Sequence, residues 1–359
     1  MKVVIAGGGT GGHLYSGTAV YDILTREGRH EVSFIGTRDG IEARVLPGRG
    51  IDVRYIPVVK FRRSGIGAKV MSVGVLPLSG ICALAALLKI KPDVVLGVGG
   101  YASGPVVAAA VLLGIRRAVI EQNSVAGFTN RVLGRFVRRA FLGLPGAVAD
   151  FPRGVGVFVG NPVRQALFSV PPADQASLPF TILVFGGSQG AHRINELITE
   201  ALPFLADMKG ALSFIHLAGG NDLATVERAY EGAGMSAEVH DFREDMEHLY
   251  GRAHWVIARS GAMTVSELAA ARRASLLIPY PFAVDDHQAK NAAYLVEAGA
   301  ADMIRQEDLT GRRLSALIRE AFDNRKRLSV MGDRAGEAAR PDAARRIAEW
   351  ITGQDDRTA

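Results

Sequence analysis

The chain has 359 residues, of which 48% are hydrophobic and 22% are charged. This length and composition suit two domains with hydrophobic cores of their own and exclude an intrinsically disordered chain. A single cysteine, Cys82, excludes a disulfide framework and a cysteine zinc site, and it favours a reducing compartment. The formal net charge of +6 suits an anionic partner, whether nucleic acid, a phosphorylated substrate or a membrane surface.

The N-terminal residues 1–13 become glycine-rich too early for a signal peptide, so they predict a buried first strand. Two uncharged stretches, 70–88 and 94–115, have the length of a membrane span. Glycine and proline interrupt both stretches, which favours buried core. In the second stretch they indicate a strand, a loop and then a helix. An amphipathic element lying on a membrane surface is the alternative.

Short apolar runs that end in glycine loops predict parallel strands with helices between them. In chain order these runs are 2–6, 31–36, 94–99, 118–123, 181–186, 213–219, 255–261 and 275–280. The alternation occurs twice and is typical of α/β domains with parallel sheets. We expect two doubly wound Rossmann-like domains facing one another across a cleft, one covering 1–163 and the other 164–340. The segment 341–359 is expected to pack back on the first domain.

Four glycine-rich loops follow predicted strands, two in each half of the chain: 7–13, 97–105, 186–191 and 258–267. Glycine lets backbone N–H groups approach a phosphate at a helix N-terminus. The first loop satisfies G-x-G-x-x-G, which is typical of nicotinamide or flavin dinucleotide folds. Four such loops exceed what one dinucleotide needs and suit two phosphorylated ligands. For any single loop, an ordinary strand-to-helix turn is the alternative.

Seven motifs occur in one order along essentially the whole chain: GGGTGGH, GYASGP, EQN, GNPVR, GGSQGA, ARSGAMTVSELAA and DDHQAKNA. In these motifs and in their order, the chain resembles the MurG family of peptidoglycan N-acetylglucosaminyltransferases. The resemblance implies a GT-B-type architecture and inverting transfer of N-acetylglucosamine from UDP-GlcNAc to the 4-hydroxyl of the muramyl sugar of lipid I. The products would be lipid II and UDP. It further implies peptidoglycan synthesis, with a role in cell shape and division, at the cytoplasmic face of the bacterial inner membrane as a peripheral protein.

The resemblance assigns UDP-GlcNAc to thirteen residues: Thr10, Gly11, Gly12, Asn123, Arg164, Ser188, Phe242, Arg243, Ala262, Met263, Thr264, Glu267 and Gln288. The Ser188 hydroxyl and the Arg164 guanidinium suit the diphosphate, and the Glu267 carboxylate suits the ribose hydroxyls. Two positions on the expected donor side depart from the family. Arg243 stands where the family tends to have an apolar residue, so only backbone contacts carry over. His287 stands where a glutamine is common, which leaves one of two sugar contacts open.

Two residues are candidates for the general base. His13 closes the first glycine loop, and a helix N-terminus disfavours its cation, so it suits proton abstraction from the acceptor hydroxyl. Capping or contacting phosphate is its alternative role. Glu121 is either the base or the residue that orients Asn123, and Ile120 replaces a histidine that some relatives have. The acceptor diphosphate is expected at Gly100, Tyr101, Ala102, Ser103 and Gly104, together with Thr10–Gly12.

Neither a metal nor another cofactor is expected, because the sequence contains no D-x-D triplet to hold a metal-bridged diphosphate. Charge on the leaving UDP would then be stabilised by Arg164, the N–H groups of the loops and a helix dipole. The pair Asp285 and Asp286 is a weak metal candidate that we interpret as a helix start.

An anionic membrane surface is the expected partner of the first half. The apolar segment 65–78 lies among basic residues, and its expected membrane contacts are Arg62, Arg63, Lys69, Met71, Val75 and Leu76. Four arginines at helical spacing predict one basic helix face: Arg131, Arg135, Arg138 and Arg139. A loop and a solvated helix face are the alternative. Nucleic acid is not expected, because basic residues are dispersed and only 7% of residues are aromatic.

Two other functions stay open on the residues. A UDP-sugar epimerase can share the two-domain fold without a lipid acceptor. An NAD-dependent oxidoreductase accounts for the first glycine loop and for Asp39, but it leaves the second half of the chain unexplained.

Overall fold

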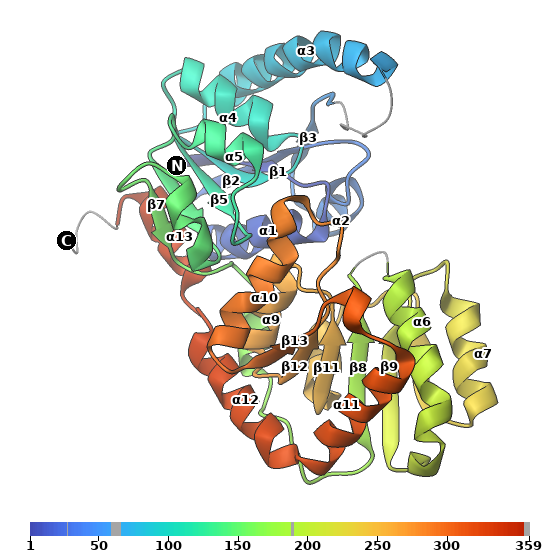
Figure 1. Cartoon of the computed structure of the whole chain (residues 1–359). Coiled ribbons are helices and arrows are strands. Elements are labelled where there is room, and N and C mark those ends of the chain that lie inside the picture. The colour runs from blue at the N-terminus through green and yellow to red at the C-terminus, as the bar shows by residue number, and fades with distance from the viewer. Residues whose placement is uncertain (27, 59–65, 188–189, 355–359) are drawn as a thin grey trace. The chain divides into compact units, whose positions relative to one another are not determined.

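The structure is a computed structural model that describes residues 1–26, 28–58, 66–187 and 190–354, with only the backbone described for 66–76. The chain divides into two compact units. The first comprises Met1–Val163 and Pro341–Ala359, and the second comprises Arg164–Arg340. Each unit contains a parallel sheet flanked by helices (Figure 1). The predicted α/β fold with two parallel sheets is therefore confirmed.

The first unit has a seven-stranded sheet in the order β3-β2-β1-β4-β5-β6-β7. Its strands are β1 (Lys2–Gly7), β2 (Glu31–Gly36), β3 (Val53–Tyr55), β4 (Val94–Gly99), β5 (Arg116–Glu121), β6 (Arg139–Leu142) and β7 (Gly156–Phe158). Its helices are α1 (Gly11–Thr25), α2 (Glu42–Gly48), α3 (Ile66–Ile90), α4 (Ser103–Leu112), α5 (Phe128–Leu133) and α13 (Ala343–Thr352), with a short 3-10 helix at Pro145–Asp150. The strand order reverses between β1 and β4. In such sheets ligands bind beyond the carboxyl ends of the strands at this reversal.

Alternating side chains of β1 build two cores, one on each face of the first sheet. Val3 and Ile5 are buried with residues of α1 and α13, among them Trp350. Val4 is buried on the other face with residues of α3, α4 and α5, among them Val106. The last helix of the chain thus completes the core of the first unit, and Figure 1 shows α13 beside that sheet.

The second unit has a six-stranded sheet in the order β10-β9-β8-β11-β12-β13. Its strands are β8 (Phe180–Phe185), β9 (Leu212–Leu217), β10 (Ser236–His240), β11 (Trp255–Ala258), β12 (Ser275–Leu277) and β13 (Ala301–Met303). Its helices are α6 (His192–Ala201), α7 (Leu223–Ala233), α8 (Met246–Arg252), α9 (Ala262–Ala270), α10 (His287–Glu297), α11 (Gly311–Asp323) and α12 (Arg325–Ala338). Short 3-10 helices lie at Gln165–Ser169, Leu202–Met208, Val284–Asp286 and Gln306–Asp308. Here the order reverses between β8 and β11, and a glycine-rich loop follows each of these two strands.

All eight apolar runs form strands, most of them ending one to three residues before the predicted end. Five further strands, β3, β6, β7, β10 and β13, have only three to five residues each and were not singled out by hydrophobicity. The stretch 94–115 forms β4, a loop and α4, as predicted. None of the described helices combines the length and the hydrophobicity that a membrane span requires.

The prediction that four arginines share one helix face is wrong. Helix α5 ends at Leu133, the next residues form turns, and Arg139 begins β6. The guanidinium of Arg139 donates to the carbonyl of Gly154. The C-cap residue of the helix is Gly134, where a Cβ atom would lie 2.6 Å from the ring of Phe151. Further on, pairing with β5 holds residues 139–142 in an extended conformation. Spacing alone indicated a helix that tertiary packing does not allow.

Candidate active site

The two glycine loops of the first unit contact each other backbone to backbone. Gly8 donates its N–H to the carbonyl of Gly99 at 3.2 Å. A Cβ atom on Gly7 would lie 2.2 Å from that carbonyl oxygen, and one on Gly100 would lie 2.1 Å from the carbonyl oxygen of Gly8. These four residues have positive φ angles, so only glycine fits both the conformation and the space. The loops after β1 and β4 thus form one surface at the reversal of strand order.

A cavity of about 740 Å³ opens on this surface between α3, α4 and α5. Seven of the predicted site residues line it: Thr10, His13, Gly100, Tyr101, Gly104, Glu121 and Asn123. The remainder of the lining includes apolar side chains of the three helices, among them Leu84, Leu112 and Phe128. Ala102 and Ser103 are buried at the start of α4 instead, with the Ser103 hydroxyl beside Gly97. The cavity therefore joins a polar end at the glycine loops to an apolar region along the helices.

His13 lies on the first turns of α1 at the polar end of this cavity. Its Nδ1 is 3.2 Å from the carbonyl oxygen of Gly8 and 3.2 Å from the hydroxyl of Thr10. Since a carbonyl only accepts, Nδ1 must carry the hydrogen of that bond, which leaves the lone pair on Nε2. Burial lowers the pKa of His13, although the Gly8 bond and the charges of Glu121 and Glu42 raise it in part. His13 is therefore a neutral imidazole near pH 7.

Glu121 is buried at the end of β5 and accepts four hydrogen bonds. Its Oε1 accepts from the backbone N–H and the side-chain amide of Asn123, at 3.0 and 3.2 Å. Its Oε2 accepts from the N–H of Gly127 at 3.0 Å and from the amide of Asn130 at 2.9 Å. A carboxylate with this set of donors is suited to holding Asn123 in place at the cavity wall. Sequence spacing did not indicate Asn130, which lies on α5.

In the second unit, Arg164, Glu267 and Tyr250 belong to one polar cluster. Tyr250 donates its hydroxyl to Oε2 of Glu267 at 3.3 Å. Arg164 donates to the carbonyl of Glu244 at 2.6 Å and lies 3.2 Å from the carboxylate of Glu247. Burial raises the pKa of Glu267 to about 7, although the charge of Arg164 lowers it in part. Glu267, which is predicted to bind the ribose, and Arg164, which is predicted to bind the diphosphate, thus influence each other electrostatically.

Helix α9 begins where the sequence predicted it. Its N-cap is Gly261, and Ala262, Met263 and Thr264 form its first turn. Glu267 lies one turn further on the same helix. The first turn of a helix presents unpaired N–H groups and a positive dipole end, which suits the predicted contact with an anionic ligand.

The side chain of Gln288 is oriented by a backbone group. Its Oε1 accepts from the N–H of Tyr280 at 2.9 Å, which leaves the amide NH₂ as a donor. The neighbouring His287 lies with Nδ1 2.8 Å from the carbonyl of Val284. Asp286 is the N-cap residue of α10, in line with the predicted helix start, and both its oxygens bind Arg305.

The segment 241–245 has its own internal contacts. Arg243 donates two hydrogen bonds to the Asp245 carboxylate, at 2.8 and 2.6 Å. Phe242 donates its N–H to Asp241 at 2.6 Å. The guanidinium of Arg243 is thus engaged with a neighbouring carboxylate of the same segment. Ser188, the predicted diphosphate ligand, lies outside the described residues.

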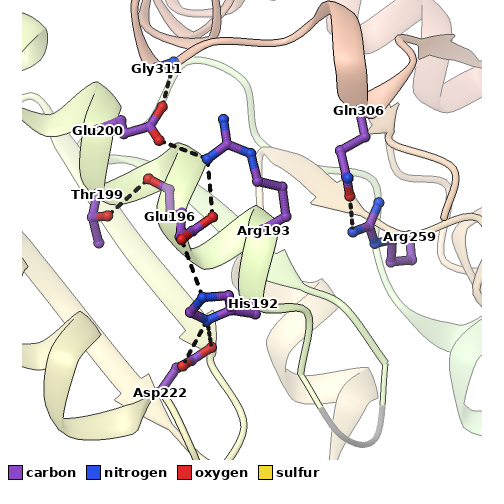
Figure 2. A network of polar contacts seen from close by, with 9 residues as sticks. All are labelled: His192, Arg193, Glu196, Thr199, Glu200, Asp222, Arg259, Gln306 and Gly311. Carbon is purple, nitrogen blue, oxygen red and sulfur yellow. Dashed lines mark hydrogen bonds and ion pairs between the residues drawn. The ribbon is translucent and has the colours of Figure 1, made fainter. Parts of the chain in front are cut away.

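Figure 2 shows the side chains at the start of α6, the helix that follows the glycine-rich segment after β8. His192, the first residue of α6, lies with Nδ1 3.0 Å from both oxygens of Asp222 and with Nε2 3.2 Å from Glu196. The hydrogen bond to Asp222 is the main reason why the pKa of His192 is raised. Gly190 packs against the carbonyl of Ala218, where a Cβ atom would lie 2.2 Å away. These contacts hold Gly190 and the start of α6 against the segment after β9.

Arg259 was not singled out from the sequence, yet it lies next to the predicted donor residues. It is buried after β11 and donates to the carbonyls of Ile278 and Pro279, at 3.1 and 3.0 Å. It also donates to Oε1 of Gln306 at 2.5 Å (Figure 2). Arg259 thereby holds the segment that leads to Tyr280, whose N–H orients Gln288. Over the described ranges, no three His, Cys, Asp or Glu side chains form a group that could hold a metal ion.

The comparisons with known proteins agree with this geometry. Residues 3–142 match the glycosyltransferase family 28 N-terminal domain, and residues 181–347 match the glycosyltransferase family 28 C-terminal domain. The chain is thus a family 28 glycosyltransferase with a GT-B-type fold. A crystal structure of MurG from Acinetobacter baumannii superposes with a TM-score of 0.78 at 32% identity, covering 98% of this chain and 99% of that one.

Curated relatives narrow the assignment. The UDP-N-acetylglucosamine–N-acetylmuramyl-(pentapeptide) pyrophosphoryl-undecaprenol N-acetylglucosamine transferase of Myxococcus xanthus is 47% identical over 97% of this chain and 92% of its own length. The enzyme of that name from Citrifermentans bemidjiense is 45% identical over 99% of this chain and 100% of its own length. The chain belongs to this family, the MurG family, as the seven motifs predicted. A UDP-GlcNAc 2-epimerase from Neisseria meningitidis, at 13% identity and a TM-score of 0.67, shares the fold alone, so the epimerase alternative is not favoured.

Proposed function

We propose that this chain transfers N-acetylglucosamine from UDP-GlcNAc to the 4-hydroxyl of the muramyl sugar of lipid I, with inversion, giving lipid II and UDP. Similarity to relatives of that name over nearly the full length supports the proposal. The observation that carries it is the position of His13. Its unprotonated Nε2 belongs to a cavity lined by both glycine loops that are expected to hold the acceptor diphosphate.

The acceptor is assigned to the first unit. N–H groups at the starts of α1 and α4, from Thr10–Gly12 and Gly100–Gly104, bind its diphosphate. His13 Nε2 takes the proton of the 4-hydroxyl while that oxygen attacks the anomeric carbon of the donor sugar. The bond from this carbon to the diphosphate breaks, and inversion follows from attack opposite the leaving group. Glu121 orients Asn123 and does not act as the base, because four donors already bind its two oxygens.

The donor is assigned to the second unit. Arg164 and the N–H groups around Ser188 bind the diphosphate and stabilise the charge that develops on UDP. Glu267 accepts the ribose hydroxyls, and Gln288 binds sugar hydroxyls through its amide. Phe242 and Arg243 contact the uracil through their backbone. The first turn of α9, Ala262 to Thr264, supplies further donors.

Transfer of label from UDP-GlcNAc to a lipid I analogue tests the proposal, and we expect it to persist in EDTA after divalent ions have been removed. Arginine, backbone N–H groups and helix N-termini supply the stabilisation that a metal gives elsewhere. Activity in EDTA is compared with activity after magnesium is added back. Loss in EDTA that magnesium or manganese restores would refute the metal-free mechanism, and absence of transfer in every condition would refute the proposed function.

We also propose that the face formed by α3, α4 and α5 meets an anionic membrane, as a lipid-linked acceptor requires. Leu112 and Phe128 are 75% and 76% exposed and also line the cavity, so the apolar face adjoins the proposed acceptor site. Ile81, Leu88 and Phe136 are exposed on the same elements or just beyond α5. Of the predicted membrane residues, Arg62 and Arg63 lie outside the described residues, and Lys69, Met71, Val75 and Leu76 lie where only the backbone of α3 is described.

Replacing Arg135 by glutamine should weaken binding to anionic vesicles about fivefold, because one basic residue near anionic lipid contributes about 1 kcal/mol. Arg135 is exposed beside Phe136. Arg346→Gln is the matched control, since α13 covers the opposite face of the sheet. Co-sedimentation at low and high salt measures both effects, and high salt should weaken wild-type binding. Equal loss in both variants, or binding that no salt concentration alters, would argue against this face.

A further inference from the structure

Glu42 is a buried acid that the reaction scheme above does not use. It is the first residue of α2 and is fully buried. Its Oε1 accepts from the N–H and the hydroxyl of Thr37, both at 2.8 Å. Its Oε2 accepts from the N–H of Gly9 at 2.6 Å. Glu42 does not line the cavity, whereas Thr37 and Gly9 do, so its carboxylate lies behind the first glycine loop.

Three glycines make room for this carboxylate. Cβ atoms on Gly8, Gly36 and Gly40 would lie 2.4, 2.6 and 2.1 Å from atoms of the Glu42 side chain. Burying a carboxylate is unfavourable unless donors satisfy it. Here two N–H groups and one hydroxyl donate to it, and within the described ranges no cation pairs with Glu42. A buried negative charge of this kind therefore acts on the groups that face it.

A single peptide group connects Glu42 to His13. The N–H of Gly9 and the carbonyl of Gly8 belong to the same peptide bond. Glu42 accepts from that N–H at 2.6 Å, and the carbonyl accepts from Nδ1 of His13 at 3.2 Å. Hydrogen bonds at the two ends of one amide polarise each other, so a carboxylate at the N–H makes the carbonyl a stronger acceptor.

We propose that Glu42 is a positioning residue that acts on His13 through the Gly8–Gly9 peptide group. It holds the hydrogen on Nδ1, fixes the ring and leaves Nε2 as the proton acceptor. In Ser-His-Asp triads a carboxylate holds the histidine directly, and here one peptide group lies between the two. This inference rests on the proposed function, in which Nε2 of His13 takes the acceptor proton.

The charged groups around His13 indicate how removal of the Glu42 charge would change the pKa of His13. Two carboxylates act on its ring, Glu42 from α2 and Glu121 from β5, and both raise its pKa against the effect of burial. Glu121 is bound to Asn123, Gly127 and Asn130, not to the Gly8–Gly9 peptide. Removing the charge of Glu42 alone should therefore lower the pKa of His13 further and weaken the hold on Nδ1.

The test is Glu42→Gln in the full chain, with Asp22→Asn as the matched control. Asp22 lies on α1 and pairs with Arg49, next to α2, but on the exposed side. For Glu42→Gln we expect kcat to fall about fivefold, donor KM to stay unchanged, and the acid limb of the kcat profile to move to lower pH. Glu42→Asp, which keeps the charge, should keep the acid limb near its wild-type position. Asp22→Asn should match the wild type.

Nuclear magnetic resonance of protein labelled with ¹⁵N-histidine supplies a readout without turnover. Wild-type His13 should carry its hydrogen on Nδ1, and an Nε2–H tautomer would overturn the inference even if Glu42→Gln did not fold. A folded Glu42→Gln protein with an unmoved pH profile and an unchanged tautomer would overturn it too. His13→Gln separates the proposed function from the inference about Glu42. Full activity of His13→Gln would refute His13 as the general base. An inactive His13→Gln together with an unaffected Glu42→Gln would refute only the positioning role of Glu42.

Discussion

Replacing His13 by glutamine should lower kcat for sugar transfer by about 10²–10⁴-fold, the range that a positioned general base contributes. Glutamine has a similar size and still reaches the carbonyl of Gly8, but it has no ring nitrogen to accept a proton. Donor KM should stay within about twofold, since Arg164, Glu267 and Gln288, the donor contacts of the proposed scheme, belong to the second unit. Steady-state kinetics with a soluble lipid I analogue measure both constants.

The pH profile gives a second check on the same residue. Because burial lowers the pKa of His13, the neutral base persists below pH 6.5, the ordinary value for the group. Wild-type kcat should therefore begin to fall only on the acid side of that value, and His13→Gln should lack this limb. His30→Gln is the control, since His30 precedes β2 at the opposite end of the strands. A kcat for His13→Gln within tenfold of the wild type would exclude His13 as the base.

The sheets follow from local sequence because their central strands are buried on both faces. Strands β1, β4 and β8 are almost entirely buried, so they read as uninterrupted apolar runs. Short edge strands carry no such signal. Strand β10 has an exposed or half-buried side chain at every position and is defined by pairing with β9. Its strand state is a property of its neighbours, which sequence periodicity does not report.

Motifs identified the residues at the ends of strands but not the residues that hold them. His13 ends the motif GGGTGGH and Glu121 begins the motif EQN, so the sequence pointed to both residues directly. Glu42 is 33 residues from Gly9, and Tyr250 is 17 residues from Glu267. Such partners come together only through packing between elements, and no spacing rule within one helix or strand connects them. The prediction left the base open between His13 and Glu121. The four hydrogen bonds that Glu121 accepts come from the loop after β5 and from α5. They favour His13 as the base, because they engage both oxygens of Glu121.

Replacing Glu267 by glutamine should raise donor KM about tenfold or more, with a smaller effect on kcat. Hydrogen bonds to a charged acceptor contribute about 1.5–3 kcal/mol, and glutamine keeps the shape of the side chain while removing the charge. The hydroxyl of Tyr250 keeps an oxygen to donate to, so the cluster should still fold. Glu297→Gln is the control, because Glu297 is an exposed acid at the end of α10.

The same substitution should remove a pH dependence of donor binding. The pKa of Glu267 is raised to about 7, so its carboxylate is increasingly protonated as the pH falls through 7. A protonated carboxyl group accepts ribose hydroxyls less well than a carboxylate, so wild-type donor KM should rise as the pH is lowered from 8 to 6. In Glu267→Gln the KM should be high at both values and nearly constant. A donor KM that is unchanged at pH 8 in the folded variant would remove Glu267 from the donor site. A wild-type KM that is flat from pH 6 to 8 would show that the donor does not discriminate between the two forms of this carboxyl group.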